Sequence, residues 1–191
     1  MEMEFTITLA NPDERFHIAP LIYEAIGDIA FRLTGEKEEQ KMLKKLQELI
    51  ASDNNRHSYL NTFVAKLDEE IVGIIVLYDG KTGRELDRKL EKAIFEQNGV
   101  SIQIDVEAYD HEFYIDTLCI APSKRGLGLG TKLLHFAEQE GKRRGYNILS
   151  LNVEVEKTKA RALYTKLGFI EAEPWSIIDE PFIHMVKEIN K

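Results

Sequence analysis

The chain has 191 residues, enough for one domain (1–191) that buries about 70% of its unfolded surface without disulfides. Its formal net charge of −8 argues against a nucleic-acid partner, because backbone phosphates would be repelled, although it suits a cationic amine. A lone cysteine, a start unlike a signal peptide and no apolar run long enough for a bilayer favour a cytoplasmic protein without membrane contact.

The first 80 residues predict a strand, two helices and a two-stranded hairpin. In chain order, these elements are expected at 5–9, 16–33, 36–50, 62–66 and 71–78. The last of these strands is apolar on both faces, so we expect it at the centre of a sheet. The polar loop 52–57 is either a candidate substrate contact or an exposed connector.

The rest of the chain alternates helices and strands. Helices are expected at 84–97, from 131 to 141–145 and at 160–167, and strands at 100–106, 113–120, 146–153 and 182–186. Strands that alternate with helices around a mixed sheet indicate an α/β fold.

A glycine-rich stretch, Arg125-Gly126-Leu127-Gly128-Leu129-Gly130-Thr131, lies between an expected strand and an expected helix. Glycines let a ligand approach the backbone closely, and the first amides of a helix point outward with partial positive charge. Such a loop suits a phosphate or pyrophosphate. Neither the Walker pattern nor the dinucleotide fingerprint fits the order of its glycines, threonine and lysine.

The spacing R-x-x-G-x-G does fit, at Arg125, Gly128 and Gly130. In this position it resembles the acetyl-CoA pyrophosphate loop of the GNAT N-acetyltransferases. A glycine turn alone is also compatible with an ordinary strand–helix connection, or with a phosphate-binding protein that merely shares the loop.

A second motif strengthens the resemblance. The strand at 149–153 leads to a short helix that carries A-x-x-x-Y at Ala160 and Tyr164 and ends in a Gly-Phe pair. Together the two motifs are similar to the GNAT pattern over residues 113–170. The resemblance implies a GNAT-like mixed, largely antiparallel sheet flanked by helices, with a helical insertion at about 81–108 that we expect beside the acceptor site.

The resemblance also implies that acetyl-CoA donates an acetyl group to a primary amine. The candidate cofactor-binding residues are Leu118, Cys119, Ile120, Arg125, Gly126, Leu127, Gly128, Leu129, Gly130, Thr131, Asn152 and Lys157. The strand residues 118–120 would pair with the pantetheine arm, and a backbone N–H there would stabilise the oxyanion. Lys157 stands where the family often has an asparagine that holds this arm.

The candidate acid is Tyr164, which resembles the family tyrosine that protonates the departing thiolate. Its place on an apolar helix stripe also fits a core residue. A module that binds acyl-CoA without turnover is the alternative function. Since family members are often dimers, a homodimer is one expectation, and the scattered histidines predict no metal site.

For the base, Asp116 is the first choice, because an apolar strand would raise the pKa of its carboxyl. Glu112, which alternation places on the same face, and Glu154, just past the next strand, are further candidates. His57 and His111 titrate in a suitable range. A chain of waters would need no single base.

Overall fold

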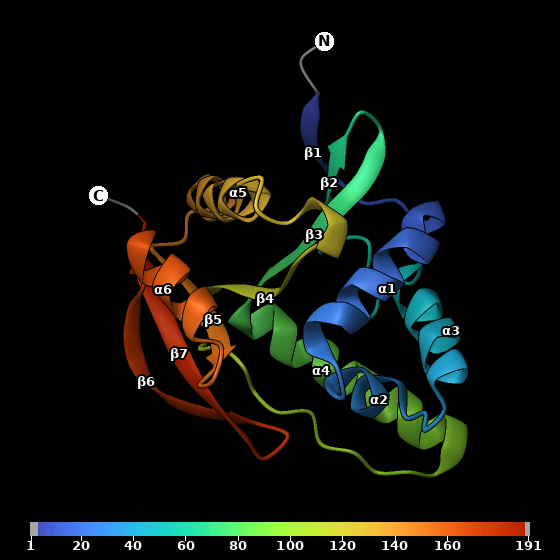
Figure 1. Cartoon of the computed structure of the whole chain (residues 1–191). Helices are drawn as coiled ribbons and strands as arrows, with labels where there is room; N and C mark the ends of the chain where they lie inside the picture. Colours follow the sequence, from blue (N-terminus) through green and yellow to red (C-terminus); the bar gives the residue numbers. More distant parts are fainter. Residues whose placement is uncertain (1–3, 190–191) are drawn as a thin grey trace.

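Seven strands form one sheet in the computed structural model, which describes residues 4–189 (Figure 1). They are β1 (Phe5–Leu9), β2 (Thr62–Leu67), β3 (Glu70–Asp79), β4 (Phe113–Ile120), β5 (Ile148–Glu154), β6 (Ile170–Ile177) and β7 (Glu180–Glu188). Their order across the sheet is β1-β2-β3-β4-β5-β7-β6, and only β4 and β5 are parallel neighbours. The expected mixed, largely antiparallel sheet is confirmed.

Helices cover both faces of this sheet. They are α1 (Arg15–Ile26), α2 (Ile29–Thr34), α3 (Glu39–Ile50), α4 (Gly80–Asn98), α5 (Leu129–Arg143) and α6 (Thr158–Lys166). Each face of the sheet therefore has its own hydrophobic core. Consecutive residues of β3 point into different cores, since Ile74 packs with α1 and α3 while Ile75 packs with α5. Figure 1 shows α5 on one side of the sheet and α1 and α3 on the other. None of the helices within 4–189 has the length and apolar character to cross a membrane.

The single helix expected at 16–33 is wrong, because the structure has two. Gly27 adopts a positive φ of 53° and donates its N–H to the carbonyl of Tyr23, which ends α1. Such a φ favours glycine, since a Cβ would be strained there. The chain turns at this residue, and α2 begins at Ile29.

α4 begins at Gly80, earlier than the helix expected at 84–97. The side chain of Asp79 accepts a hydrogen bond from the backbone N–H of Thr82 at 2.9 Å and caps the helix. The glycine at position 83 is required by packing, because a Cβ there would lie 2.4 Å from the ring of Tyr78.

The strand expected at 100–106 is also wrong. Residues 99–112 form an irregular segment, here called the 99–112 segment, between α4 and β4. Its apolar alternation reflects packing of Ile102 and Ile104 into a small core with α4. Its backbone bonds to neighbouring side chains rather than to a strand, through the pairs Arg32–Gln103, Glu91–Ile104, Trp175–Val106 and Asn152–Glu107. These bonds pair four backbone groups of the segment and hold it without a strand partner.

β6 was not expected, because its sequence carries little strand signal. It contains Glu171, Glu173 and Pro174 and lies at the edge of the sheet beside β7. Charges and proline are typical of edge strands, where they discourage pairing with another chain.

Candidate active site

The two parallel strands at the centre of the sheet separate after a short paired stretch. Hydrogen-bonded partners join 113–115 of β4 to 149–151 of β5, but β4 continues to Ile120 and β5 to Glu154. Side chains around this split line two adjoining spaces. We call the space beside the glycine loop the outer cleft and the space beside α1, α2 and the 99–112 segment the inner pocket.

Most of the expected cofactor-binding residues line the outer cleft. Its walls include Leu118, Cys119, Ile120, Arg125, Gly126, Gly128, Leu129, Gly130, Thr131 and Lys157. Leu127 is exposed and lines neither space, and Asn152 lines only the inner pocket.

The glycine loop leaves room above its backbone. Gly126 and Gly128 have positive φ values of 81° and 73°, and no atom lies within 4 Å of the position of a Cβ at either. Gly128 is the N-cap of α5, so the first amides of this helix open toward the outer cleft. This geometry suits a phosphate group at the positive end of the helix dipole.

The side chain of Arg125 already forms two polar contacts within the protein. Its Nε donates to the carbonyl of Ile120 at 3.1 Å, and its Nη2 contacts Glu24 at 2.9 Å. These contacts tie the loop to β4 and α1. The thiol of Cys119 packs into the core beneath α1, so this residue faces the cleft through its backbone.

Tyr164 lies where the outer cleft meets the inner pocket, since its side chain lines both. Its ring is 6.0 Å from that of Phe169 in an edge-to-face contact. Burial raises the pKa of Tyr164 above its ordinary value. The phenol therefore keeps its proton at neutral pH.

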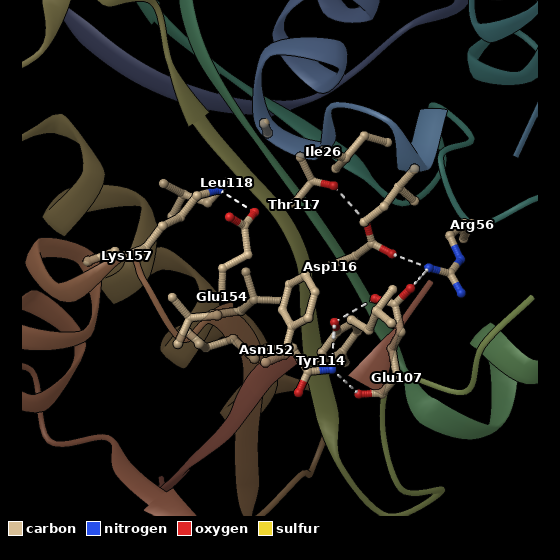
Figure 2. A pocket seen from close by; sticks show the side chains of 18 of the residues that line it. Ile26, Arg56, Glu107, Tyr114, Asp116, Thr117, Leu118, Asn152, Glu154 and Lys157 are labelled. Carbon is tan, nitrogen blue, oxygen red and sulfur yellow. Dashed lines mark hydrogen bonds and ion pairs between the residues drawn. The ribbon is translucent and has the colours of Figure 1, made fainter. Parts of the chain in front are cut away.

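The inner pocket holds a cluster of charges around Arg56, and Figure 2 shows these side chains pointing toward one another. Arg56 is 2% exposed and makes a two-point contact with Asp87, with both distances 2.8 Å. Its Nη1 also contacts Glu107 and, at 3.2 Å, Asp116. Burial disfavours the guanidinium charge, but these carboxylates outweigh it and hold the pKa of Arg56 well above its ordinary value.

A β-bulge sets the position of Asp116. Thr117 pairs with Val76 and Ile115 pairs with Leu77, so Asp116 has no partner across the ladder. A bulge re-aims neighbouring side chains. Asp116 and Thr117, adjacent in sequence, both contact the Nε2 of His57, at 3.0 and 3.4 Å.

The raised pKa expected for Asp116 is wrong. Burial disfavours its charge, but His57, Arg56 and a hydrogen bond from Thr117 together hold the pKa of Asp116 well below its usual range. Tyr78 also donates to the same carboxylate. A carboxylate with four partners is a weak proton acceptor.

The pKa of Glu107 is shifted in the opposite direction to that of Asp116, although no sequence pattern identified Glu107 as a candidate. Burial raises the pKa of its carboxyl above the ordinary value, and the guanidinium of Arg56 opposes this only in part. Its Oε2 accepts a hydrogen bond from Tyr114 at 2.7 Å. Its side chain is 10% exposed, compared with 3% for Asp116. No periodic signal marks Glu107, because it lies in the irregular 99–112 segment.

The other expected bases lie elsewhere or are paired. Glu112 contacts His184 and Ser150 and does not line the inner pocket. Burial disfavours its charge, but the bonds from His184, Tyr109 and Ser150 hold the pKa of Glu112 below its ordinary value. Glu154 lines the pocket and forms an ion pair with Lys157 at 2.7 Å.

The polar loop expected at 52–57 contributes directly to the inner pocket. Arg56 and His57 are both buried and line it, so this loop is not an exposed connector. His111, by contrast, is exposed and lines neither the inner pocket nor the outer cleft.

A split sheet with a glycine loop at one end and Tyr164 at the junction of two spaces is the arrangement expected of an acyltransferase domain. A family model described as the acetyltransferase (GNAT) family matches residues 19–169. The chain belongs to this family, which is a family of acyltransferase enzymes.

Known proteins agree with this assignment. A crystal structure described as an acetyltransferase is 29% identical, with a TM-score of 0.80 over 97% of this chain and 100% of that one. The N-acetyltransferase from Staphylococcus aureus is 25% identical, with a TM-score of 0.82 over 95% of this chain and 99% of that one. An uncharacterized N-acetyltransferase of Methanocaldococcus jannaschii is 38% identical over 79 residues, which are 41% of this chain. The matched part spans 31% of that curated relative.

Proposed function

We propose that this protein transfers an acetyl group from acetyl-CoA to a primary amine. The observation that carries the proposal is that the two spaces adjoin, since they share Leu118, Lys157 and Tyr164 among their lining residues. A donor in the outer cleft and an acceptor in the inner pocket would meet at this junction. The cytoplasmic location and the homodimer expected from the sequence stay predictions.

The donor would lie along the outer cleft. Its pyrophosphate would accept hydrogen bonds from the amides of 126–131 at the start of α5. Its pantetheine arm would run beside 118–120, the part of β4 that has no partner on the β5 side. The thioester would then reach Tyr164.

The reaction needs three groups beyond the two substrates. The amine nitrogen attacks the thioester carbonyl carbon, and a backbone N–H of 118–120 stabilises the oxyanion. The carbon–sulfur bond then breaks, and Tyr164 protonates the departing thiolate. The proton released by the amine passes to Glu107, which is pocket-facing and has a raised pKa. Asp116, with its lowered pKa, would instead hold Arg56 and His57 in place.

Replacing Tyr164 with phenylalanine tests the acid. We expect turnover to fall by about 100- to 10,000-fold, because the thiolate loses its proton donor. Acetyl-CoA affinity should stay near that of the wild type, since the ring remains. Release of the CoA thiol with a panel of amines measures turnover. Tyr146→Phe is the control, because Tyr146 stacks on Phe113 and lines neither space. Equal activity of the Tyr164→Phe variant and wild type would remove this residue from the mechanism.

Replacing Gly128 with valine tests the pyrophosphate loop. The positive φ makes this change cost about 1–2 kcal/mol of stability, and the new side chain would occupy the space above the loop. Gly145→Val is a matched control, because Gly145 has a φ of 83° and equally open surroundings at the other end of α5. We expect both variants to lose similar stability and only Gly128→Val to lose the thermal shift with acetyl-CoA. A full shift in Gly128→Val would contradict the assignment of the loop.

A further inference from the structure

The side chains around the inner pocket carry more negative than positive charge. Glu107, Asp116 and Glu154 line it, and Asp87 lies behind Arg56. These four carboxylates face two permanent cations, Arg56 and Lys157. The pocket therefore has an excess of negative charge, even when His57 is protonated.

Each basic side chain of the pocket already has a carboxylate partner. Arg56 contacts three of them and is fully buried. Lys157 contacts Glu154 at 2.7 Å, and His57 contacts Asp116 at 3.0 Å. Among the lining residues that the structure describes, no basic side chain is without a carboxylate partner.

Most other residues that line the pocket are apolar, and Tyr114, Thr117, Asn152 and Tyr164 are the polar ones. One wall comes from the end of α1 and from α2, with Ile26, Ile29 and Leu33. Further apolar residues come from the hairpin of β6 and β7, with Ile177 and Phe182. These side chains offer a hydrocarbon surface next to the acidic cluster.

We infer that the acceptor is an alkyl or arylalkyl primary amine that carries no carboxylate beside its amine, an inference that rests on the proposed function. The ammonium group is drawn to the acidic cluster, and the hydrocarbon body lies against the apolar walls. A carboxylate next to the amine would meet the carboxylates of Glu107 and Asp116, and the basic groups beside them, Arg56 and His57, already have carboxylate partners. Like charges brought together in this way cost several kcal/mol, so α-amino acids are rejected.

Three amines of matched size test this inference. Pentylamine, hexan-2-amine and norleucine share one alkyl chain and carry hydrogen, methyl and carboxylate, respectively, on the carbon beside the amine. Hexan-2-amine controls for the branch, so its comparison with norleucine isolates the charge. The rate of CoA release is measured for each amine with acetyl-CoA and wild-type protein, beside a thermal melt with acetyl-CoA alone.

We expect kcat/KM for norleucine to be at least about 100-fold below that for hexan-2-amine, which corresponds to about 2.7 kcal/mol. Equal use of norleucine would overturn the inference. A thermal shift with acetyl-CoA but no turnover of any of the three amines would overturn the acceptor class and leave the donor site standing. No thermal shift would overturn the proposed function itself.

Discussion

Replacing Glu107 with glutamine is expected to lower kcat/KM by about 100- to 10,000-fold, because a neutral amide does not take the proton of the amine. Glutamine keeps the size of the side chain and an oxygen that accepts from Tyr114. In the proposed function acetyl-CoA would lie in the outer cleft, which Glu107 does not line, so its affinity should not change. Release of the CoA thiol and a thermal melt with acetyl-CoA measure the two effects separately.

The pH profile separates a catalytic role for Glu107 from a structural one. A base works only when it is ionised, so the wild-type rate should fall as the pH drops through the pKa of Glu107. Since burial raises this pKa, the fall should begin at a higher pH than for an ordinary carboxyl. The Glu107→Gln variant should lack this acidic limb.

Glu154→Gln is the matched control for this experiment. Glu154 also lines the inner pocket, but it pairs with Lys157 and is 44% exposed. We expect this variant to keep the acidic limb and most of its activity. If Glu154→Gln loses the acidic limb while Glu107→Gln keeps it, the base is Glu154, which was one of the candidates from the sequence.

Replacing Arg56 with methionine is expected to destabilise the fold by about 3–5 kcal/mol, because it leaves three buried carboxylates without their permanent cation. For a chain of this size the loss corresponds to roughly 6–20 °C in Tm. The loss should shrink as the pH is lowered, because the unpaired carboxyls then take up protons in the folded state. Denaturant unfolding at several pH values measures both effects.

The control for this change is Arg143→Met on the surface of α5. The side chain of Arg143 is 70% exposed and pairs with Glu140 at 2.7 Å. Removing this exposed cation is expected to cost little stability, because exposed pairs in general contribute about 0–1 kcal/mol and Glu140 also pairs with Arg144 at 2.7 Å. If Arg56→Met is no more destabilised than Arg143→Met, the cluster around Arg56 does not hold the inner pocket together.

The parts of the site that the sequence predicts are those encoded over a few neighbouring residues. The glycine loop between a strand and a helix is such a pattern, and so is the helix that carries Tyr164. Both depend on local backbone geometry, which spacing reports well. The same kind of signal predicted most helices and strands along the chain, but not the break between α1 and α2, the irregular 99–112 segment or β6.

The charged cluster could not be predicted in this way. Arg56, Asp87, Glu107 and Asp116 come from four separate segments, and only the topology of the sheet brings them together. The pKa of Asp116 was expected to be raised because burial was visible in the sequence and its cationic partners were not. Glu107 lies in the 99–112 segment, whose hydrogen bonds to distant side chains leave no periodic pattern.

The most direct test of the account is a thermal melt with and without acetyl-CoA. At a ligand concentration 100 times the Kd, binding should stabilise the protein by about 2.7 kcal/mol. This corresponds to a rise in Tm of roughly 5–11 °C for a chain of this size. The account predicts such a rise with acetyl-CoA and none with an unrelated nucleotide. An unchanged Tm at saturating acetyl-CoA would contradict the assignment of the outer cleft as the donor site.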